Sequence, residues 1–272
     1  MTKPVPTLVT LAVAALFYGF PVVAQLAQPN GSGVAWGHIH LNVTDLERHE
    51  QIWVQHFGGV QVDLDLVSTI RLPATIIMLN ERAPTGGTQG SGIDHFGFSV
   101  PDLASFLERW RTDGLEVANE FEGAGGVPQA YVTMPDGIRI ELQEVPTLGV
   151  PAEPYHVHLY TGDGAEEQRD WYADLFSMEP RRRGTIPYTA DVPGINVSFT
   201  DAPDGVAATR GRAIDHIGFE INGLESFVKD LEARGVVFDV PYRVIEELGV
   251  AIAFFTDVSG VRVELTEGLR QY

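Results

Sequence analysis

Residues 92–100 read Gly-Ile-Asp-His-Phe-Gly-Phe-Ser-Val, and residues 213–221 read Ala-Ile-Asp-His-Ile-Gly-Phe-Glu-Ile. The agreement continues into the amphipathic segments that follow both stretches. A repeat of this length indicates a duplicated fold and lets the chain be compared with itself. Each copy carries one histidine, His95 or His216, in the middle of a predicted strand.

The composition limits the partners of the chain and its chemistry. Its 272 residues have a formal net charge of −19. This argues against a nucleic-acid partner, because a strongly acidic surface repels phosphates. The basic run Arg181 to Arg183 is interpreted as a solvated loop, with an anion site as the alternative. The sequence contains no cysteine, so any bound metal must use nitrogen and oxygen ligands.

Residues 1–24 have the pattern of a secretory signal peptide. Lys3 precedes the apolar run 8–20, and small residues ending at Ala24 follow. We therefore predict a periplasmic or secreted protein that begins near Gln25 and has no stable membrane anchor after cleavage. An uncleaved anchor is the alternative, although the apolar run is shorter than the ~20 residues that a membrane span needs.

Four units follow, each with the pattern of a strand, a helix and further strands. A proline-bearing linker near residue 150 separates an N-terminal domain, 34–145, from a C-terminal domain, 154–267. The units are placed at residues 34–84, 92–145, 154–203 and 212–267.

Alternation along the predicted strands separates an apolar face from a polar face. The polar face of each half carries two histidines and a glutamate, which are suitable ligands for a divalent first-row metal. The same parity puts Trp36 on the polar face and Tyr155 on the apolar face. Hydrogen-bonded histidines on a solvated sheet face are the alternative. In chain order the residues are His38, His95 and Glu141, then His156, His216 and Glu264.

These residues resemble the vicinal oxygen chelate (VOC) superfamily, which includes glyoxalase I, extradiol dioxygenases, fosfomycin resistance enzymes and bleomycin-sequestering proteins. The resemblance rests on a His in the opening strand, a His in Asp-His-x-Gly-Phe and a Glu in Gly-x-Arg-x-Glu-Leu, and it covers nearly all of the chain after the signal peptide. It implies an α+β fold of two glyoxalase-like domains, each a pair of βαβββ modules that form a cupped mixed sheet around a metal.

The resemblance also implies which residues bind the metal. It assigns one triad to the N-terminal domain and one to the C-terminal domain, and it leaves open assembly from modules of different pairs or subunits. We expect a metal in the C-terminal domain first, and the resemblance leaves open whether the N-terminal domain also holds one. The implied ligands are His38, His95 and Glu141 in the first domain and His156, His216 and Glu264 in the second.

The chain departs from the family pattern at two places. Where glyoxalase I has a fourth protein ligand, the corresponding strands offer Met78 and Ser198, which are poor ligands for a hard divalent ion. A three-ligand site favours Fe2+ or Mn2+, with Zn2+ or Ni2+ also compatible. Extradiol enzymes place a further histidine and tyrosine in the cavity, and His158 and Tyr160 are our candidates for these catalytic roles. A purely structural role for both is the alternative.

We therefore predict an exported metal-dependent enzyme whose small-molecule substrate chelates the metal through vicinal oxygens. The missing fourth ligand favours extradiol dioxygenase chemistry over a glyoxalase-like lyase or isomerase. A protein that sequesters a drug or metabolite without turnover is the rival from another class. A homodimer is compatible with the resemblance.

Overall fold

The chain folds into four copies of one supersecondary unit. The computed structural model describes residues 25–62, 64 and 67–272, so the predicted signal peptide lies outside the described residues. Each unit consists of a strand, a helix and three further strands. The predicted α+β class and the βαβββ order are therefore confirmed, and we number the units modules 1 to 4 in chain order.

The modules begin and end within a few residues of the predicted units. Module 1 contains β1 (Val34–Val43), α1 (Leu46–Phe57), β2 (Val60–Val62), β3 (Ser68–Leu72) and β4 (Thr75–Glu81). Module 2 contains β5 (Ile93–Val100), α2 (Leu103–Thr112), β6 (Glu116–Glu122), β7 (Pro128–Met134) and β8 (Ile138–Glu144). Module 3 contains β9 (Glu153–Thr161), α3 (Ala165–Phe176), β10 (Glu179–Arg183), β11 (Ile186–Val192) and β12 (Ile195–Asp201). Module 4 contains β13 (Ile214–Ile221), α4 (Leu224–Ala233), β14 (Phe238–Ile245), β15 (Val250–Thr256) and β16 (Arg262–Glu267).

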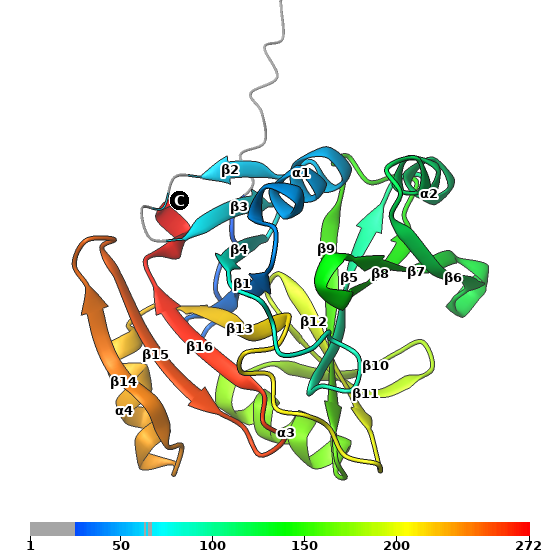
Figure 1. The fold of residues 1–272 in the computed structure, drawn as a ribbon. Helices are drawn as coiled ribbons and strands as arrows, with labels where there is room; N and C mark the ends of the chain where they lie inside the picture. Colours follow the sequence, from blue (N-terminus) through cyan, green and yellow to red (C-terminus); the bar gives the residue numbers. More distant parts are fainter. Residues whose placement is uncertain (1–24, 63, 65–66) are drawn as a thin grey trace, which may run out of the picture.

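The modules form two eight-stranded mixed sheets (Figure 1). The strand order is β14-β15-β16-β13-β1-β4-β3-β2 in one sheet and β10-β11-β12-β9-β5-β8-β7-β6 in the other. We call the first sheet, from modules 1 and 4, cup 1, and the second, from modules 2 and 3, cup 2. The predicted pairing of modules into sheets is confirmed. The expected partners are wrong, because each cup combines one module from each half of the chain.

The opening strands of the modules lie at the centre of each cup. Strand β1 pairs antiparallel with β13, and β5 pairs antiparallel with β9. Each of these strands pairs in parallel on its other side with the closing strand of its own module. The first strand of one module therefore lies beside the first strand of a module from the other half.

The helices join the two cups into one core. Trp53 of α1 packs against Phe96 and Phe98 of β5, with ring centroids 5.9 Å apart in each pair. Phe176 of α3 stacks on Phe219 of β13 at 4.3 Å. Trp53 and Phe176 are fully buried. Because α1 and α3 each contact a strand of the opposite cup, modules that are neighbours in sequence meet through their helices.

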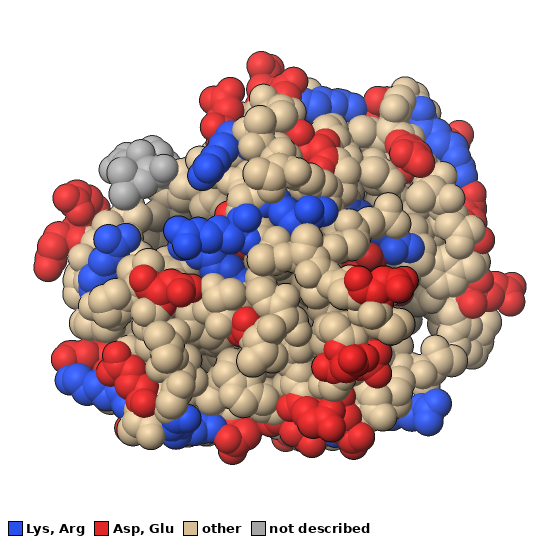
Figure 2. Space-filling view, turned by 60° about the horizontal axis from the view of Figure 1, so that its bottom comes forward, with Lys and Arg blue, Asp and Glu red and all other residues tan. Residues whose placement is uncertain are grey.

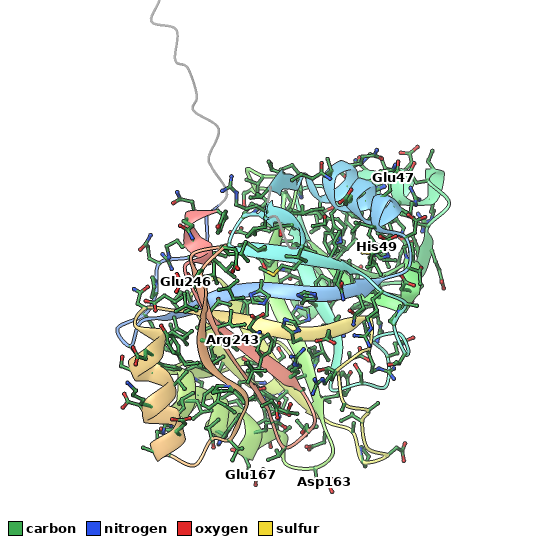
Figure 3. All side chains as sticks on the ribbon, turned by 60° about the vertical axis from the view of Figure 1, so that its left-hand side comes forward. Glu47, His49, Asp163, Glu167, Arg243 and Glu246 are labelled. Atoms are coloured by element: carbon green, nitrogen blue, oxygen red, sulfur yellow. The ribbon has the colours of Figure 1, made fainter. Side chains whose placement is uncertain are left out.

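Helix α1 shows how the sequence sets a helix and its buried face. The Asp45 side chain accepts a hydrogen bond from the Arg48 backbone N–H at 2.9 Å, which satisfies a free N–H group of the first turn. Gly58, with φ 72°, ends the helix in the left-handed conformation. His49 is buried on the side of α1 that faces the strands, whereas Glu47 is exposed (Figure 3). His49 is therefore a packing residue.

In each half of the chain, an aspartate lies in the turn before the closing strand of the second module. Its side chain contacts the helix region of the first module. Asp136 accepts hydrogen bonds from the backbone N–H and the hydroxyl of Thr44, both at 2.9 Å. Asp257 accepts them from the Tyr172 hydroxyl at 2.8 Å and from the Gln168 amide at 2.6 Å, both on α3. Burial raises the pKa of Asp257. The repeated contact holds the two modules of each half together.

Charged side chains cover the surface unevenly. Figure 2 shows acidic side chains around most of the visible face and basic side chains gathered in a band across its upper part. This distribution agrees with the excess of Asp and Glu in the composition. None of the helices in the described part of the chain is long and apolar enough to cross a membrane.

Replacing Asp257 by alanine should lower the free energy of unfolding by ~3 kcal/mol, because it leaves the buried Tyr172 and Gln168 donors without an acceptor. Urea denaturation measures the loss. Asp230→Ala, at an exposed position on α4, is the matched control and should be nearly neutral. Equal stability of the two variants would contradict a structural role for Asp257.

Candidate metal centres

Cup 1 brings three predicted ligands together. His38 of β1 and His216 of β13 both direct Nε2 at one oxygen of Glu264 on β16, at 2.8 Å and 2.9 Å. All three side chains are buried. One ligand atom from each lies within 4.8 Å of the others. We call this trio cluster 1.

The equivalent strands of cup 2 form a second cluster. His95 Nε2 of β5 lies 3.1 Å from Glu141 Oε2 of β8, and His156 Nε2 of β9 lies 3.7 Å from the same oxygen. We call His95, His156 and Glu141 cluster 2. His158, two residues further along β9, has a ring nitrogen within 4.8 Å of ring nitrogens of His95 and His156.

All six predicted ligands lie in these clusters, but the clusters cut across the predicted triads. Sequence order groups His38 with His95 and Glu141, whereas the fold places His38 with His216 and Glu264. The grouping within each half is therefore wrong. Its physical reason is the pairing of β1 with β13 and of β5 with β9, which makes modules from different halves neighbours.

A glycine in each repeated motif makes room for the histidine of the partner strand. Gly218 pairs with His38, and a Cβ atom at Gly218 would lie 1.9 Å from His38 Cε1. Gly97 pairs with His156, and a Cβ atom there would lie 2.4 Å from His156 Nδ1. Both distances are far inside van der Waals contact. The glycine of Asp-His-x-Gly-Phe is therefore needed for the imidazole to lie over the partner strand.

The aspartate of the same motif orients the histidine that follows it. His216 Nδ1 lies 2.7 Å from Asp215 Oδ1, and Arg262 donates to that oxygen at 2.8 Å. Such carboxylates fix the tautomer and the ring orientation of ligand histidines. This contact also explains the recurrence of an arginine two residues before the cluster glutamate. The equivalent contacts in module 2 join His95, Asp94 and Arg139.

Each motif histidine, His95 or His216, therefore has an aspartate next to Nδ1 and a glutamate next to Nε2. If His216 donates Nδ1–H to Asp215, a neutral ring directs the Nε2 lone pair at Glu264, and two acceptors meet at 2.9 Å. A proton or a cation between them removes the repulsion. Burial lowers the pKa of His216, but the hydrogen bonds to Asp215 and Glu264 outweigh it, so the pKa is raised above its usual value. The pKa of His95 is raised for the corresponding reasons. Both clusters therefore favour positive charge where their ligand atoms meet.

Cluster 2 also contains a histidine whose ring nitrogens have no hydrogen-bond partner in the described structure. Neither ring nitrogen of the fully buried His156 has a hydrogen-bond partner among the described residues. Burial lowers the pKa of His156 well below its usual value, so the ring is neutral. A buried nitrogen without a partner is unfavourable, and an ion bound by His156, His95 and Glu141 would satisfy it. Two imidazoles and one carboxylate are a donor set that fits a divalent first-row metal.

Two tyrosines outside the predicted ligands and catalytic residues bind Glu141. Tyr155 donates to Oε1 at 2.5 Å, and Tyr131 donates to Oε2 at 2.9 Å. Burial and the nearby carboxylate raise the pKa of both phenols, which therefore stay protonated. Burial alone would raise the pKa of Glu141, but contacts with His95, His156 and Tyr155 hold the pKa below its usual range. Glu141 is thus maintained as a carboxylate.

Irregular strand register explains two strand-parity predictions that were wrong. The register of β9 against β5 shifts at Tyr155, which turns into cup 2 instead of joining the apolar face. The register of β1 against β13 shifts at Gly37, so Trp36 lies fully buried in the core. A β-bulge adds one residue and changes the face of those beyond it. Gly37, and Pro154 before Tyr155, are the sequence signals for these bulges.

The two predicted catalytic residues lie beside cluster 2. The ring centroid of His158 is 4.9 Å from that of His95, and His158 Nε2 is 2.8 Å from Thr200 Oγ1. Burial, followed by the nearby His95, lowers the pKa of His158 to about 3. Tyr160 stacks on His158 at 5.1 Å and lines a separate hollow together with Asp94. Tyr160 therefore supports His158 from the side.

His40 is the cup 1 counterpart of His158 and was not predicted as a site residue. Its ring stacks on His216 at 4.5 Å. Burial, followed by the nearby His216, lowers the pKa of His40 to about 3. The His-x-His pattern shared by the two opening strands β1 and β9 was the signal that could have identified it.

The cups differ in what surrounds their clusters. Cup 2 has a cavity of about 700 Å3, lined in part by Glu141, Tyr155, Gln143 and Arg183, which is within the usual size range of ligand sites. Cup 1 carries a buried apolar group next to cluster 1. That group includes Ile76, Met78, Val250, Ile252, Phe254 and Leu269.

The residues at the fourth-ligand positions already have other partners. Met78 belongs to the apolar group of cup 1. Ser198 donates its hydroxyl to Asn196 at 2.9 Å. Neither Met78 nor Ser198 therefore joins the two histidines and the glutamate of its cup, whereas His40 and His158 lie beside them.

Both halves of the chain match the Glyoxalase/Bleomycin resistance protein/Dioxygenase superfamily, over residues 35–142 and 155–265. The chain belongs to this superfamily. This membership confirms the VOC resemblance recognised in the sequence. The superfamily contains metal-dependent enzymes and proteins without enzymatic activity, so the function must follow from the clusters.

Solved structures of the glyoxalase superfamily share the fold of the chain. Glyoxalase I from Zea mays is 19% identical, with 86% of this chain and 92% of that chain covered and a TM-score of 0.69. A protein from Bacillus subtilis that has been proposed to be a dioxygenase is 15% identical, with coverages of 90% and 86% and a TM-score of 0.69. No curated protein sequence matches the chain. At these identities the likeness concerns the fold.

Replacing Gly218 by alanine should destabilise the protein by ~1–3 kcal/mol, because the new Cβ would overlap the His38 ring. Urea denaturation measures the change. Gly162→Ala is the matched control, since a Cβ there meets nothing within 4 Å. The double variant Gly218→Ala/His38→Ala should recover part of the loss. If Gly218→Ala is as stable as the control, the close approach is not a constraint on the fold.

Proposed function

We propose that the chain is an exported, divalent-metal-dependent VOC enzyme whose small substrate binds through two adjacent oxygens. One observation carries the proposal. In each cup a histidine oriented by an aspartate directs its second ring nitrogen at a buried glutamate, at 2.9 Å in cluster 1 and 3.1 Å in cluster 2. The unpartnered Nε2 of His156 adds to it in cluster 2. Export is proposed from the signal-like residues 1–24.

The donor set favours Fe2+ or Mn2+. Two histidines and one carboxylate with open positions are the ligands of non-haem Fe2+ oxygenases. When bound, the metal would act as a Lewis acid and template for the substrate oxygens. The residues that would hold it are His38, His216 and Glu264 in cup 1, and His95, His156 and Glu141 in cup 2.

Cup 2 is the better candidate for the reaction site, because its cavity reaches Glu141. Tyr155 and Tyr131 hold Glu141 as a carboxylate, and Asp94 orients the His95 ring so that Nε2 points at it. His158 is uncharged at neutral pH and places a hydrogen-bonding ring beside the cluster. It therefore suits the positioning of a substrate hydroxyl.

Extradiol-type dioxygenase chemistry is the reaction that we favour. The fourth-ligand positions are taken by Met78, in an apolar group, and Ser198, bound to Asn196. A metal held by three protein residues would keep positions open for a chelating substrate, as oxygenase chemistry requires. A lyase or isomerase would keep the chelated substrate without oxygen uptake, and a sequestering protein would bind it without turnover.

Purified protein equilibrated with Mn2+ and then desalted should retain two ions per chain, since both clusters offer the same donor set. His156→Ala should reduce the content to one, and His156→Ala/His38→Ala should abolish it. Inductively coupled plasma mass spectrometry gives the stoichiometry. His56→Gln is the matched control, because His56 is a buried histidine outside both cups that contacts Asp113. Retention of both ions in the double variant would rule out these ligands.

Anaerobic loading with Fe2+, followed by catechol and air, should give oxygen uptake and a coloured ring-cleavage product. Glu141→Gln should lower the rate by a factor of about 100 or more, because it removes a charged ligand. An oxygen electrode and absorbance spectroscopy measure the reaction, again with His56→Gln as the control. Chelation without oxygen uptake over a broad panel of catechols would contradict the dioxygenase reaction. A lyase and a binding protein would then be the remaining functions.

A further inference from the structure

Arg183 is a basic residue of cup 2 that lies close to cluster 2. It is the last residue of β10, and its guanidinium lies over the Tyr155 ring, with Cζ 5.2 Å from the centroid. The hydroxyl group of the same Tyr155 donates to Glu141. One tyrosine thus connects Arg183 to cluster 2.

The charge of Arg183 is not balanced by a neighbouring acid. No carboxylate oxygen of the described residues forms an ion pair with it within 4.0 Å. Its Nε is buried without a hydrogen-bond partner, and its closest polar contact is Ser198 Oγ at 3.4 Å from Nη2. A partly buried guanidinium with free donors is unfavourable unless an acceptor reaches it.

The neighbouring arginines have different surroundings. Arg181 pairs with Asp191 at 2.8 Å. Arg182 is exposed and donates to the Gly184 carbonyl oxygen at 3.1 Å. In this basic run, Arg183 is the arginine that combines partial burial with unused donors.

Arg183 and Glu141 line the same cavity of about 700 Å3. A ligand in that space can therefore meet both the guanidinium and the glutamate of cluster 2. The cavity wall also includes the acidic Glu122 and the amides of Gln129 and Gln143. In a chain of net charge −19, a fixed local cation is needed to hold an anion against the overall repulsion.

Cup 1 lacks this arrangement in the described structure. Arg71 of β3, whose cross-strand partner is Ile76, donates to the Tyr272 carbonyl oxygen. A buried apolar group lies next to cluster 1. The two cups thus present different environments to a ligand.

We propose that cup 2 takes an acidic substrate, with Arg183 pairing to a carboxylate of a molecule whose adjacent oxygens reach cluster 2. The guanidinium suits this role because its donors match the two oxygens of a carboxylate. This inference rests on the proposed function of cup 2 and adds its substrate class. The basic run was predicted to be a solvated loop, but it lies on strand β10, and the proposal makes one of its residues an anion site.

Two probes with the same vicinal diol test the proposal: catechol, and 3,4-dihydroxybenzoate, which adds a carboxylate. The full chain carrying His38→Ala, which disables cluster 1, is loaded with Mn2+ without oxygen, and calorimetry gives the Kd of each probe. We expect tighter binding of 3,4-dihydroxybenzoate. Arg183→Gln should reduce the ratio of the two Kd values by about tenfold, which corresponds to ~1.4 kcal/mol. Comparing ratios between variants cancels the intrinsic difference between the diols.

Arg182→Gln is the matched control and should keep the ratio of the parent. Arg183→Lys should keep part of it, because the charge remains and the forked geometry is lost. An unchanged ratio in Arg183→Gln, with Mn2+-dependent catechol binding intact, overturns the acidic substrate and leaves the proposed function standing. If neither diol binds in a Mn2+-dependent way, the proposed function fails and this inference falls with it.

A measurement on the parent protein covers the case in which Arg183→Gln does not fold. The preference for 3,4-dihydroxybenzoate should weaken between about 0.05 and about 0.5 M NaCl, because salt screens the charge pair. A preference that is absent, or that does not change with salt, overturns the role of Arg183.

Discussion

The structure depends on the close approach of two opening strands in each cup. In the antiparallel pairs β1–β13 and β5–β9, an imidazole lies over the partner strand at a glycine. A single methyl group at Gly218 or Gly97 would occupy the space of that ring. The glycine therefore allows His38 to lie over module 4 and His156 over module 2. The position of both clusters depends on this contact.

The remaining residues of the repeated motifs complete the same unit. The aspartate before each motif histidine fixes its ring, and the arginine of the closing strand holds the aspartate. These contacts are the same in both cups, whereas the walls are not. Cup 1 places apolar side chains next to its cluster, and cup 2 places Tyr131, Tyr155 and Arg183 near its own. Duplication has kept the cluster and its supports, and the linings have diverged.

The sequence was sufficient to predict the modules, the superfamily and the residues that converge. Strand parity assigned His38, His95, Glu141 and their counterparts to the cup side correctly, although register shifts lie next to His38, His95 and His156. It failed at Trp36 and Tyr155, where a bulge adds one residue and reverses the face. A bulge depends on pairing with a distant strand, so a single strand does not reveal it. The choice of partner module was missed for the same reason. The repeated glycine makes room for a histidine of a distant strand, and the sequence alone does not show which strand pairs with it.

The central claim is that each metal centre combines residues from both halves of the chain. An anomalous difference map from crystals grown with Mn2+ tests it most directly, because it locates the ions without prior assignment of ligands. We expect two peaks, one among His38, His216 and Glu264 and one among His95, His156 and Glu141. Peaks that lie away from these clusters would contradict the account. The absence of peaks at both clusters, in crystals that hold Mn2+ at other sites, would also contradict it.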